Sequence, residues 1–458
     1  MPSLSLAAII EATGAQAVCT GEVVVSAVSA DSRQILPGCL FVALRGDSFD
    51  GHHFVSQALA DGAAFAVVEA GTHVEAPPEK LLAVADTRQA LLAIAGLHRQ
   101  LFAVEMVAIT GSVGKTTTKE MIACVCQSRF STLKTEMNLN NEIGVSQMLF
   151  KLAPTHQVAV LEMGMDGPGQ IAPISRAVAP DIAVVTNIGV SHLEAMGTME
   201  NTCREKLAIR AGMSDGGVLL LNGDDPMLKG LQDDRLTILL YGLNNPDFAI
   251  WGHDIEEHGN QSSFVITYEG QDYPAVVPAI GRHNIGNALA AFGVGVTLGL
   301  HPAEAAAALR HYAPAGMRQR VTTHKAFTIV EDCYNASPDS MKAALETLGH
   351  MPCRGRRIAV LADMLELGTV AEESHRAVGA LAATCGVDML FCTGPLAHLY
   401  QTGAIEAGME PEQARYFGGK DGLLAGLKEA AKAGDVLWFK ASRGMHLEDV
   451  LEKIHQEW

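Results

Sequence analysis

The chain reads Ala108-Ile109-Thr110-Gly111-Ser112-Val113-Gly114-Lys115-Thr116-Thr117-Thr118 at its most informative point. The apolar run from Met106 to Ile109 predicts a buried strand, two glycines allow a tight loop, and the residues after Lys115 favour a helix. This order would place phosphate on backbone N–H groups at a helix N-terminus. Lys115 would then reach the outer phosphates, and the Thr116 hydroxyl would be available to Mg²⁺.

The loop departs from the general phosphate-binding pattern at one position. That pattern has a glycine five residues before Gly114, and this chain has Ile109 there. Variants of this kind are characteristic of particular families. The alternative is a glycine-rich turn from strand to helix that binds no ligand, but Gly-Lys-Thr in this context favours a nucleotide.

Length and composition indicate a well-buried protein of about three domains. Of 458 residues, 48% are hydrophobic and 18% are charged, and the formal net charge is −18. That charge would repel nucleic-acid phosphates, so we expect no nucleic-acid partner. A nucleotide remains compatible with it, because one local cationic loop outweighs distant, screened charges.

Cysteine spacing and hydropathy bear on the cellular compartment. The nine cysteines follow no repeated spacing, and Cys124 and Cys126 would diverge on a helix, which indicates free thiols. Met1 to Ile10 lacks the basic segment and cleavage site of a signal peptide. No apolar run approaches the roughly 20 residues of a membrane helix. We therefore expect a cytoplasmic protein without membrane insertion, and we expect it to be a monomer.

The order of predicted elements divides the chain into three α/β domains, at residues 1–84, 85–312 and 313–458. The first is a small α/β domain with one helical stretch, Val55 to Asp61. The second alternates buried strands and helices, which predicts a parallel sheet of P-loop ATPase type, with an antiparallel β insertion between Ile250 and Pro278. Further helices are predicted at Thr87 to Leu101 and Asn284 to Leu298.

The third domain repeats this alternation, which predicts a second doubly wound sheet of dinucleotide-fold (Rossmann-like) type. No Gly-x-Gly-x-x-Gly follows its first strand, so a dinucleotide cofactor is not predicted. The strands expected in the three domains are Val23 to Val28, Cys39 to Leu44, Ala64 to Glu69, Val158 to Glu162, Ile182 to Asn187, Val218 to Asn222, Thr237 to Tyr241, Thr328 to Asp332, Arg357 to Ala362, Met389 to Thr393 and Asp435 to Phe439.

Polar residues follow several central strands, and parallel sheets bind ligands at the carboxyl ends of their strands. Glu162 closes one strand, where its carboxylate could hold Mg²⁺ or could simply be solvated. His192 follows the next strand and could ligate a metal or polarise a phosphate oxygen, although a single histidine is more often structural. Lys206 would ordinarily be a surface residue of a helix.

Two amide-rich segments also have two interpretations each. Asn140 and Asn141 suit a hydroxyl-rich or amide-rich substrate, or belong to a turn with helix caps. Asn284 and Asn287, one turn apart at the start of a predicted helix, could read an adenine edge or could only cap that helix. Residue chemistry leaves both alternatives open.

Together these segments resemble the Mur ligase family of ATP-dependent amide-forming ligases. The likeness rests on the phosphate loop, on Asn-Leu-Asn-Asn-Glu-Ile-Gly, on His-Asn-x-x-Asn-Ala-Leu-Ala-Ala, and on Glu162, His192 and Lys206 in the family's order. It spans essentially the whole chain, because motifs of both outer domains take part. These are Asp31-Ser32-Arg33 and residues 44–52 in the first domain, and residues 332–342 and 363–368 in the third.

The resemblance implies a three-domain enzyme with ATP as a substrate. Its C-terminal signatures are similar to those of family members that join D-alanyl-D-alanine to UDP-N-acetylmuramoyl-tripeptide, so these two molecules are the other expected partners. Activation of the acid as an acyl phosphate would require its charge and that of ATP to be neutralised by Lys115 and two Mg²⁺ ions.

Matched residue by residue, the resemblance implies a role for each site residue. ATP would contact Gly111, Ser112, Val113, Gly114, Lys115, Thr116, Thr117, Asn284, Asn287, Arg318 and Asp332. One Mg²⁺ would be held by Thr116 and Glu162, and a second by His192 and a carbamylated Lys206. The catalytic residues would be Lys115, His192 and Lys206. The sugar-peptide acid and the dipeptide would contact Ser32, Arg33, Arg45, His52, Asn140, Asn141, Asn335, Ser337 and Arg443.

Carbamylation sets a condition on Lys206. A carbamate forms only from the neutral amine, and lysine has an unperturbed pKa of about 10.4. Lys206 would therefore need burial or cationic neighbours that lower its pKa.

Departures from the family pattern leave the proposed phosphate and metal ligands intact. Ser146, Ala362 and Ala441 stand where the family usually has Pro, Gly and Gly, and the last affects the expected contact of Arg443. Two other family members are less compatible with the sequence. The ligase for the third peptide residue typically carries Asp-Asn-Pro-Arg, which is missing here, and a folylpolyglutamate synthetase would not need the UDP-type first domain. A nucleotide-dependent switch would not need Glu162, His192 and Lys206.

Overall fold

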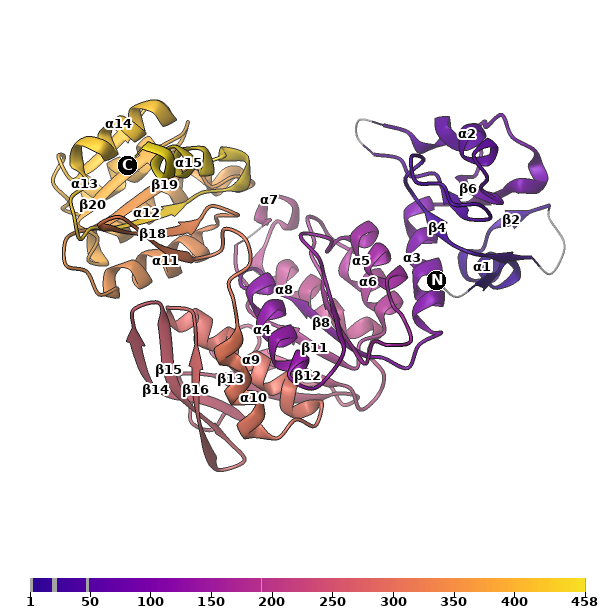
Figure 1. Ribbon diagram of the computed structural model, residues 1–458, viewed down its shortest axis with the longest axis horizontal. Coiled ribbons are helices and arrows are strands. Elements are labelled where there is room, and N and C mark those ends of the chain that lie inside the picture. Colours follow the sequence, from indigo (N-terminus) through magenta and orange to yellow (C-terminus); the bar gives the residue numbers. More distant parts are fainter. Residues whose placement is uncertain (1–2, 19–22, 47–48, 191, 458) are drawn as a thin grey trace.

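The computed structural model describes residues 3–457, apart from residues 19–22, 47–48 and 191. The described residues form three α/β domains, with the first and third at opposite ends of the molecule and the second between them (Figure 1). This confirms the expected fold class. Asp47 and Ser48, which belong to a motif of the first domain, and Ser191, which precedes His192, lie outside the described residues.

The first domain contains short strands, two α-helices and two short 3-10 helices, labelled η, within its described residues. Its elements are β1 (Leu4–Ser5), α1 (Leu6–Thr13), β2 (Gln16–Ala17), β3 (Val24–Val25), β4 (Val28–Ser29), β5 (Leu40–Val42), η1 (Gly51–Phe54), α2 (Val55–Ala60), β6 (Phe65–Glu69), η2 (Pro78–Lys80) and β7 (Leu81–Val84). The main sheet has the order β2-β7-β6-β5-β4, and β1 pairs separately with β3. Helix α2 confirms the expected helical stretch, but α1 was missed; the Ser5 hydroxyl caps it by accepting the N–H of Ala8.

Helix α3 (Thr87–Arg99) links the first domain to the second. Its N-terminus is capped by Asp86, whose carboxylate accepts the N–H groups of Arg88 and Gln89. Leu91 packs in the core of the first domain, while Leu92, on another face of the helix, packs in a core of the second. Because this helix belongs to both cores, the expected boundary between residues 84 and 85 stays a prediction.

The second domain contains the parallel sheet predicted around the phosphate loop. Its elements are β8 (Glu105–Thr110), α4 (Lys115–Gln127), β9 (Thr132–Lys134), α5 (Glu142–Phe150), β10 (Val158–Glu162), α6 (Ile171–Val178), β11 (Ile182–Val185), α7 (Leu193–Met196), α8 (Met199–Leu207), η3 (Ala208–Gly212), β12 (Val218–Asn222), β13 (Thr237–Gly242), β14 (Ile250–His258), β15 (Gln261–Tyr268), β16 (Gln271–Val277), α9 (Arg282–Thr297), α10 (Pro302–Ala308) and η4 (Leu309–His311). The strand order is β16-β15-β14-β13-β12-β11-β8-β10-β9.

Strands β14 to β16 are antiparallel to one another, as expected. They do not form a separate insertion, however. Tyr241 and Gly242 of β13 pair in parallel with Ile250 and Trp251 of β14, so these strands extend the central sheet.

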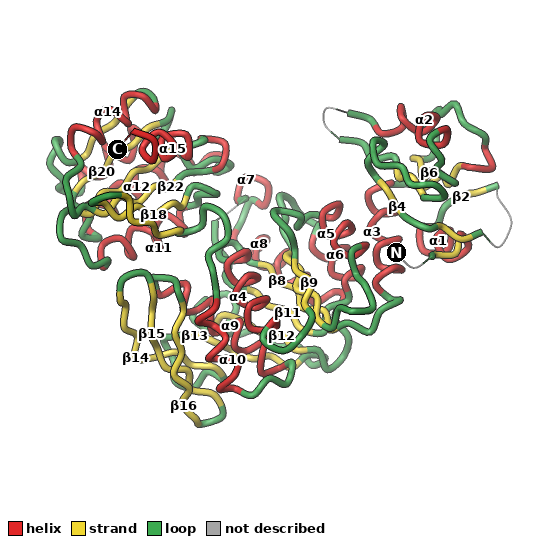
Figure 2. The backbone as a smooth tube through the Cα atoms, in the orientation of Figure 1, coloured by secondary structure: helices red, strands yellow, loops and turns green. Residues whose placement is uncertain are grey.

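Helices cover both faces of the central sheet, which explains its apolar strands (Figure 2). Alternate residues of β8 point into two different cores. Val107 and Ile109 belong to the core that includes α4 and α9, whereas Met106 and Ala108 belong to the core that includes α5 and α6. The phosphate loop follows directly on this doubly buried strand.

The third domain contains the second doubly wound sheet. Its elements are β17 (Arg320–His324), β18 (Phe327–Asp332), α11 (Pro338–His350), β19 (Arg357–Ala362), η5 (Gly368–Val370), α12 (Ala371–Thr384), β20 (Met389–Thr393), α13 (His398–Glu406), β21 (Ala414–Phe417), α14 (Lys420–Ala430), β22 (Val436–Lys440), η6 (Arg443–Met445) and α15 (Glu448–Glu457). The order is β17-β18-β22-β19-β20-β21, parallel except for β17. The four expected strands are present, and β17 and β21 were not anticipated.

Two expectations about the whole chain can be compared with the described residues. The eight cysteines that lie in them are all free. Among the helices of these residues, none combines the length and apolar character needed to cross a bilayer.

Candidate active site

The phosphate loop lies between β8 and α4, as predicted, and its glycines are required by the geometry. Gly114 has a φ of 87°, and a Cβ on it would stand 2.9 Å from Oδ1 of Asn287. A Cβ on Gly111, which has a φ of 148°, would stand 1.9 Å from Oγ1 of Thr186. Only glycine allows the loop to approach these two side chains so closely.

Lys115 begins α4 and bends back over the loop. Its Nζ donates hydrogen bonds to the carbonyl oxygens of Gly111 at 2.7 Å and Ser112 at 3.2 Å. Burial lowers the pKa of Lys115, Glu162 raises it, and the positive charge of Arg318 lowers it. The ammonium therefore lies where an anion on the loop would be attracted to it.

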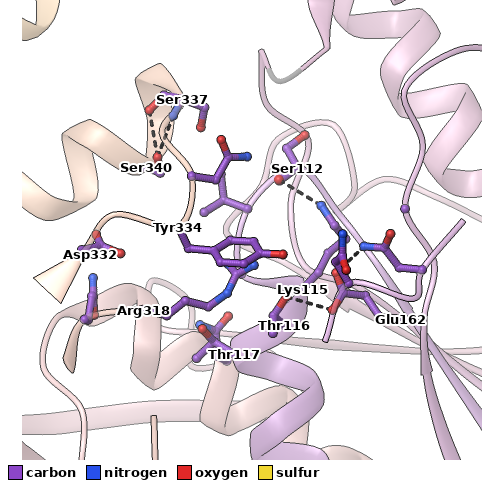
Figure 3. Close-up of a pocket in the computed structure, with 18 of the residues that line it drawn as sticks. Ser112, Lys115, Thr116, Thr117, Glu162, Arg318, Asp332, Tyr334, Ser337 and Ser340 are labelled. Carbon is purple, nitrogen blue, oxygen red and sulfur yellow. Dashed lines mark hydrogen bonds between the residues drawn. The ribbon is translucent and has the colours of Figure 1, made fainter. Parts of the chain in front are cut away.

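Glu162 faces the loop from the end of β10, and only 3% of it is exposed. Its Oε2 accepts the Thr116 hydroxyl at 2.9 Å (Figure 3). Its Oε1 accepts a hydrogen bond from Nδ2 of Asn140 at 2.9 Å. A hydroxyl, a carboxylate and an amide oxygen are hard donors of the type that Mg²⁺ prefers. The interpretation of Glu162 as a solvated strand-end residue is therefore wrong.

Lys206 lies on α8 and is buried, with 1% of its surface exposed. Interpreting it as an ordinary surface residue was wrong. Burial, and next the charge of Lys115, lower the pKa of Lys206 well below its usual value. The condition set for carbamate formation is thus met.

His192 adopts a left-handed backbone conformation, with a φ of 58°. Its Nδ1 lies 3.4 Å from Oε2 of Glu366 in the third domain. Burial and next the charge of Lys115 lower the pKa of His192, whereas Glu366 acts to raise it, and the net direction is downward. The neutral imidazole is the form that binds metal ions. Within the described residues no three His, Cys, Asp or Glu side chains form a metal cluster, so a metal here would also need hydroxyl or carbamate oxygens.

Asn284 and Asn287 of α9 form a buried amide network beside the phosphate loop. Asn287 accepts the Thr118 hydroxyl at 3.0 Å and donates to Asn284 at 3.2 Å. Asn284 donates to the Ile280 carbonyl oxygen at 2.8 Å and to Gln319 at 2.6 Å. Neither asparagine caps α9, because Gly281 is at that position. The capping alternative is therefore wrong.

The third domain supplies the opposite wall of the same cavity. The Arg318 guanidinium lies over the Tyr334 ring, 4.1 Å from its centroid, and both point toward the phosphate loop (Figure 3). Asp332 lies at the end of β18, where its Oδ2 accepts Nζ of Lys440 at 2.7 Å. Arg318 and Asp332 were predicted to reach ATP from this domain, and both line the cavity.

The cavity has a volume of about 440 Å³ and brings together most of the predicted site. The predicted residues that line it are Ser112, Val113, Gly114, Lys115, Thr116, Thr117, Asn140, Asn141, Glu162, His192, Asn284, Asn287, Arg318, Asp332, Asn335 and Ser337. Tyr334, Gln319 and Lys440 also line it and were missed. Lys440 could have been found as a charged residue at a strand end, and Tyr334 by its place beside Asp332, but no sequence signal marks Gln319.

Other predicted substrate contacts lie outside this cavity. Ser32 and Arg33 belong to the first domain, where Arg33 is exposed and pairs with Asp31 at 2.8 Å. Arg45 pairs with Asp50 and Glu69. Arg443, in the third domain, pairs with Glu448 at 2.9 Å and is half exposed.

His52 has an internal role in the first domain. It is buried, its Nδ1 lies 2.6 Å from Asp50, and its Nε2 accepts the N–H of Glu69 at 2.9 Å. A substrate contact by this side chain would require one of these bonds to be exchanged. The first domain is nevertheless linked to the cavity, because Arg88, which lines it, bonds both Glu142 and the Arg45 carbonyl oxygen.

Sequence comparison finds three domain families along the chain. The Mur ligase family catalytic domain matches residues 24–99, the Mur ligase middle domain residues 109–295, and the Mur ligase glutamate ligase domain residues 317–443. The UDP-N-acetylmuramoyl-tripeptide–D-alanyl-D-alanine ligase of Bacillus subtilis is 36% identical over 436 residues, which cover 94% of each chain. The ligase of the same name from Escherichia coli is 33% identical over 442 residues, 95% of each chain.

Solved structures show the same likeness over the full length. Crystal structure I of MurF from Acinetobacter baumannii matches with a TM-score of 0.89 and 28% identity, covering 100% of both chains. The MurF ligase of Thermotoga maritima in complex with ADP matches with a TM-score of 0.83 and 27% identity, covering 94% of this chain and 97% of that one.

Proposed function

The chain belongs to the Mur ligase family, and we propose that it joins D-alanyl-D-alanine to UDP-N-acetylmuramoyl-tripeptide at the expense of ATP, in peptidoglycan precursor synthesis. The observation that carries the proposal is a single cavity in which a phosphate loop from one domain faces Arg318 and Asp332 from another. Relatives with this activity, similar over nearly the whole chain, support it. We further propose that the enzyme acts in the cytoplasm and as a monomer.

An amide does not form readily from a carboxylate and an amine at neutral pH, because oxide is a poor leaving group. In the proposed first step, a carboxylate oxygen of the tripeptide attacks the γ-phosphorus of ATP, which gives an acyl phosphate and ADP. In the second, the dipeptide amine attacks the acyl carbon, inorganic phosphate leaves, and the amine loses a proton. Both steps bring anionic groups together, so the cavity must supply positive charge.

The chain's own cations are arranged for this purpose. Lys115 would contact the outer phosphates from the loop, and Arg318 would approach them from the third domain, because its charge already acts on Lys115. Asp332 would accept a ribose hydroxyl, with Lys440 holding its other oxygen. The N–H groups of the loop would bind phosphate oxygens at the start of α4.

The donors near the loop fit Mg²⁺. Thr116 and Glu162 would hold one ion, and His192 with a carbamylated Lys206 would hold a second. Bound Mg²⁺ offsets the negative charge of the phosphates and of the substrate acid. The burial of Lys206 and its lowered pKa support the carbamate, since a neutral amine is the form that reacts with CO₂.

Phosphate release tests the proposed reaction. The purified protein is incubated with ATP, UDP-N-acetylmuramoyl-tripeptide and D-alanyl-D-alanine, and each component is omitted in turn. We expect release only with all three. With ¹⁸O in the tripeptide carboxylate, label should appear in the inorganic phosphate. Unlabelled phosphate would exclude the acyl phosphate, and release without the dipeptide would indicate a different reaction.

A further inference from the structure

Asp339 connects the third domain to residues 187–190 of the second, a stretch that we call the coupling segment. Asp339 lies in the first turn of α11, and its Oδ2 accepts the backbone N–H of Val190 at 3.1 Å. Gly189 makes this approach possible. A Cβ at that position would stand 2.1 Å from Oδ2 of Asp339 and 3.2 Å from Cβ of Ser112, so a side chain there would push the two domains apart.

The coupling segment also holds the phosphate loop. Oδ1 of Asn187 accepts the N–H groups of Ser112 at 3.1 Å and Val113 at 2.9 Å. The Ser112 hydroxyl accepts the N–H of Gly189 at 2.7 Å and donates to its carbonyl oxygen at 3.2 Å. The start of the phosphate loop is therefore tied to the same short stretch that contacts Asp339.

The middle of the coupling segment is anchored within its own domain. Oδ2 of Asp225 accepts the N–H of Ile188 at 2.7 Å. With both its middle and its loop contacts fixed, the segment has little freedom to absorb a movement at Val190. Displacement of Asp339 would thus be passed to Ser112 and Val113.

The domain contact continues beyond the coupling segment. A Cβ on Gly368 of the third domain would stand 2.9 Å from Cβ of Glu194, so this pair also needs glycine for a close approach. The Glu366–His192 contact described above lies beside it. The two domains therefore meet at residues 189–190 and again at His192 and Glu194.

We propose that Asp339 is a positioning residue that couples docking of the third domain to the shape of the phosphate loop. Its side chain bonds Val190 and is not among the residues that line the cavity, so it would act through residues 187–190. The inference rests on the proposed function only in that ATP occupies the phosphate loop.

Four variants and one control test this role. Asp339→Ala removes the acceptor, Asp339→Asn keeps an oxygen for the Val190 N–H, and Gly189→Ala crowds the contact from the other domain. The double variant Gly189→Ala with Asp339→Ala completes a double-mutant cycle. Asp421→Ala is the control, because Asp421 is an exposed carboxylate that pairs with Lys453 within the third domain. Four quantities are measured for each protein. They are the ATP affinity without the other substrates, the KM for ATP, kcat, and the radius of gyration by X-ray scattering.

A hydrogen bond to a charged group contributes enough to change affinity by about tenfold or more. We expect Asp339→Ala to weaken ATP binding and raise the KM for ATP by about that factor, with a smaller change in kcat and a larger radius of gyration. Asp339→Asn should stay within about threefold of the wild type. The two single substitutions should be less than additive in the double variant, since they break the same contact.

The proposal is overturned if Asp339→Ala behaves like Asp421→Ala, if Asp339→Asn loses as much as Asp339→Ala, or if the cycle is additive. Should Asp339→Ala fail to fold, Gly189→Ala and Asp339→Asn still probe the same contact. The ATP-binding and scattering measurements need no ligation, so they remain decisive even if the proposed function fails.

Discussion

At the scale of single residues, Lys206 is a buried lysine that lies near another positive charge, which costs free energy if its amine is protonated. A buried ammonium beside the positive charge of Lys115 would be strongly disfavoured. Its pKa is lowered by burial and by Lys115, so the neutral amine is favoured. Conversion to a carbamate would replace a disfavoured cation with an anion near the charge of Lys115, and carbamate oxygens are donors that a metal ion can use.

We expect Lys206→Ala to abolish ligation while ATP binding is mostly kept, because the phosphate loop is unchanged. Short carboxylic acids should restore part of the activity by supplying the missing anion. Ligation rate and ATP affinity are measured side by side, with exposed Lys229→Ala as the control. Full activity of Lys206→Ala would exclude the carbamate from the mechanism.

Gly114→Ala tests the requirement for glycine in the phosphate loop. At a φ of 87°, with Asn287 Oδ1 only 2.9 Å from the added Cβ, alanine should distort the loop and displace the amide network. We expect ATP affinity to fall by at least about tenfold, which corresponds to about 1.4 kcal/mol, a typical cost of backbone strain.

The matched control for that substitution is Gly230→Ala. No heavy atom lies within 4 Å of a Cβ built there, and its φ lies outside the left-handed region. Equal ATP affinities of the two variants, measured by calorimetry, would show that the conformation of Gly114 is not required.

At the scale of elements, a buried histidine fixes α3 to the end of α5. His98 is fully buried, with Nδ1 2.9 Å from the Leu149 carbonyl oxygen at the end of α5. Its ring lies against Phe102 and Phe150, and its Nε2 has no partner among the described residues. Burial lowers the pKa of His98 below its usual value of 6.5.

This lowered pKa predicts sensitivity of folding to acid. Between pH 6.5, the value expected for the unfolded chain, and the lower pKa of the folded protein, the unfolded chain takes up a proton that folded His98 does not. Stability should therefore fall as the pH falls through this window. His98→Asn keeps a hydrogen-bond donor for the Leu149 carbonyl oxygen but cannot titrate. Thermal midpoints are compared at pH 7.5 and pH 5.5, each about one unit from 6.5. The midpoint of His98→Asn should fall less between these two pH values than that of the wild type.

His258→Asn is the control for this comparison, since His258 is largely exposed. Its thermal midpoint should follow that of the wild type at both pH values. If His98→Asn does the same, protonation of His98 contributes nothing to acid sensitivity.

At the scale of the whole molecule, the second and third domains already share the cavity, whereas the first lies at the other end (Figure 1). Arg45 and the pair Ser32 and Arg33 belong to that distant domain. A sugar-peptide acid held there must still place its carboxylate at the phosphate loop. Helix α3, which packs in both cores, is the element about which the first domain would move.

We expect a non-hydrolysable ATP analogue together with UDP-N-acetylmuramoyl-tripeptide to reduce the radius of gyration, measured by X-ray scattering. The analogue alone should have a smaller effect, because the second and third domains, which form the ATP cavity, already lie close together. UDP is the control ligand, since it lacks the peptide acid that must reach the loop. An unchanged radius with both ligands at saturation would show that the first domain does not approach.

Much of this molecule was predictable from local sequence. The pattern of hydrophobic residues identified the buried strands, since a strand covered on both faces must be apolar throughout. Gly111, Gly114 and Lys115 marked the phosphate loop because backbone geometry and charge act within a few residues. Elements with weaker local signals, such as the short strand β9 and the edge strands β17 and β21, were missed.

The amino-acid sequence by itself determined which residues can bind phosphate, where the strands end, and that three α/β domains follow one another. Only the tertiary structure decided that Lys206 is buried, that Asn284 bonds Gln319 rather than capping α9, and that Asp339 reaches Val190 across a domain boundary. The physical reason is range: propensity and turn chemistry act between near neighbours in the chain, whereas burial, pKa and interdomain hydrogen bonds depend on residues tens to more than a hundred positions away, which only folding brings together.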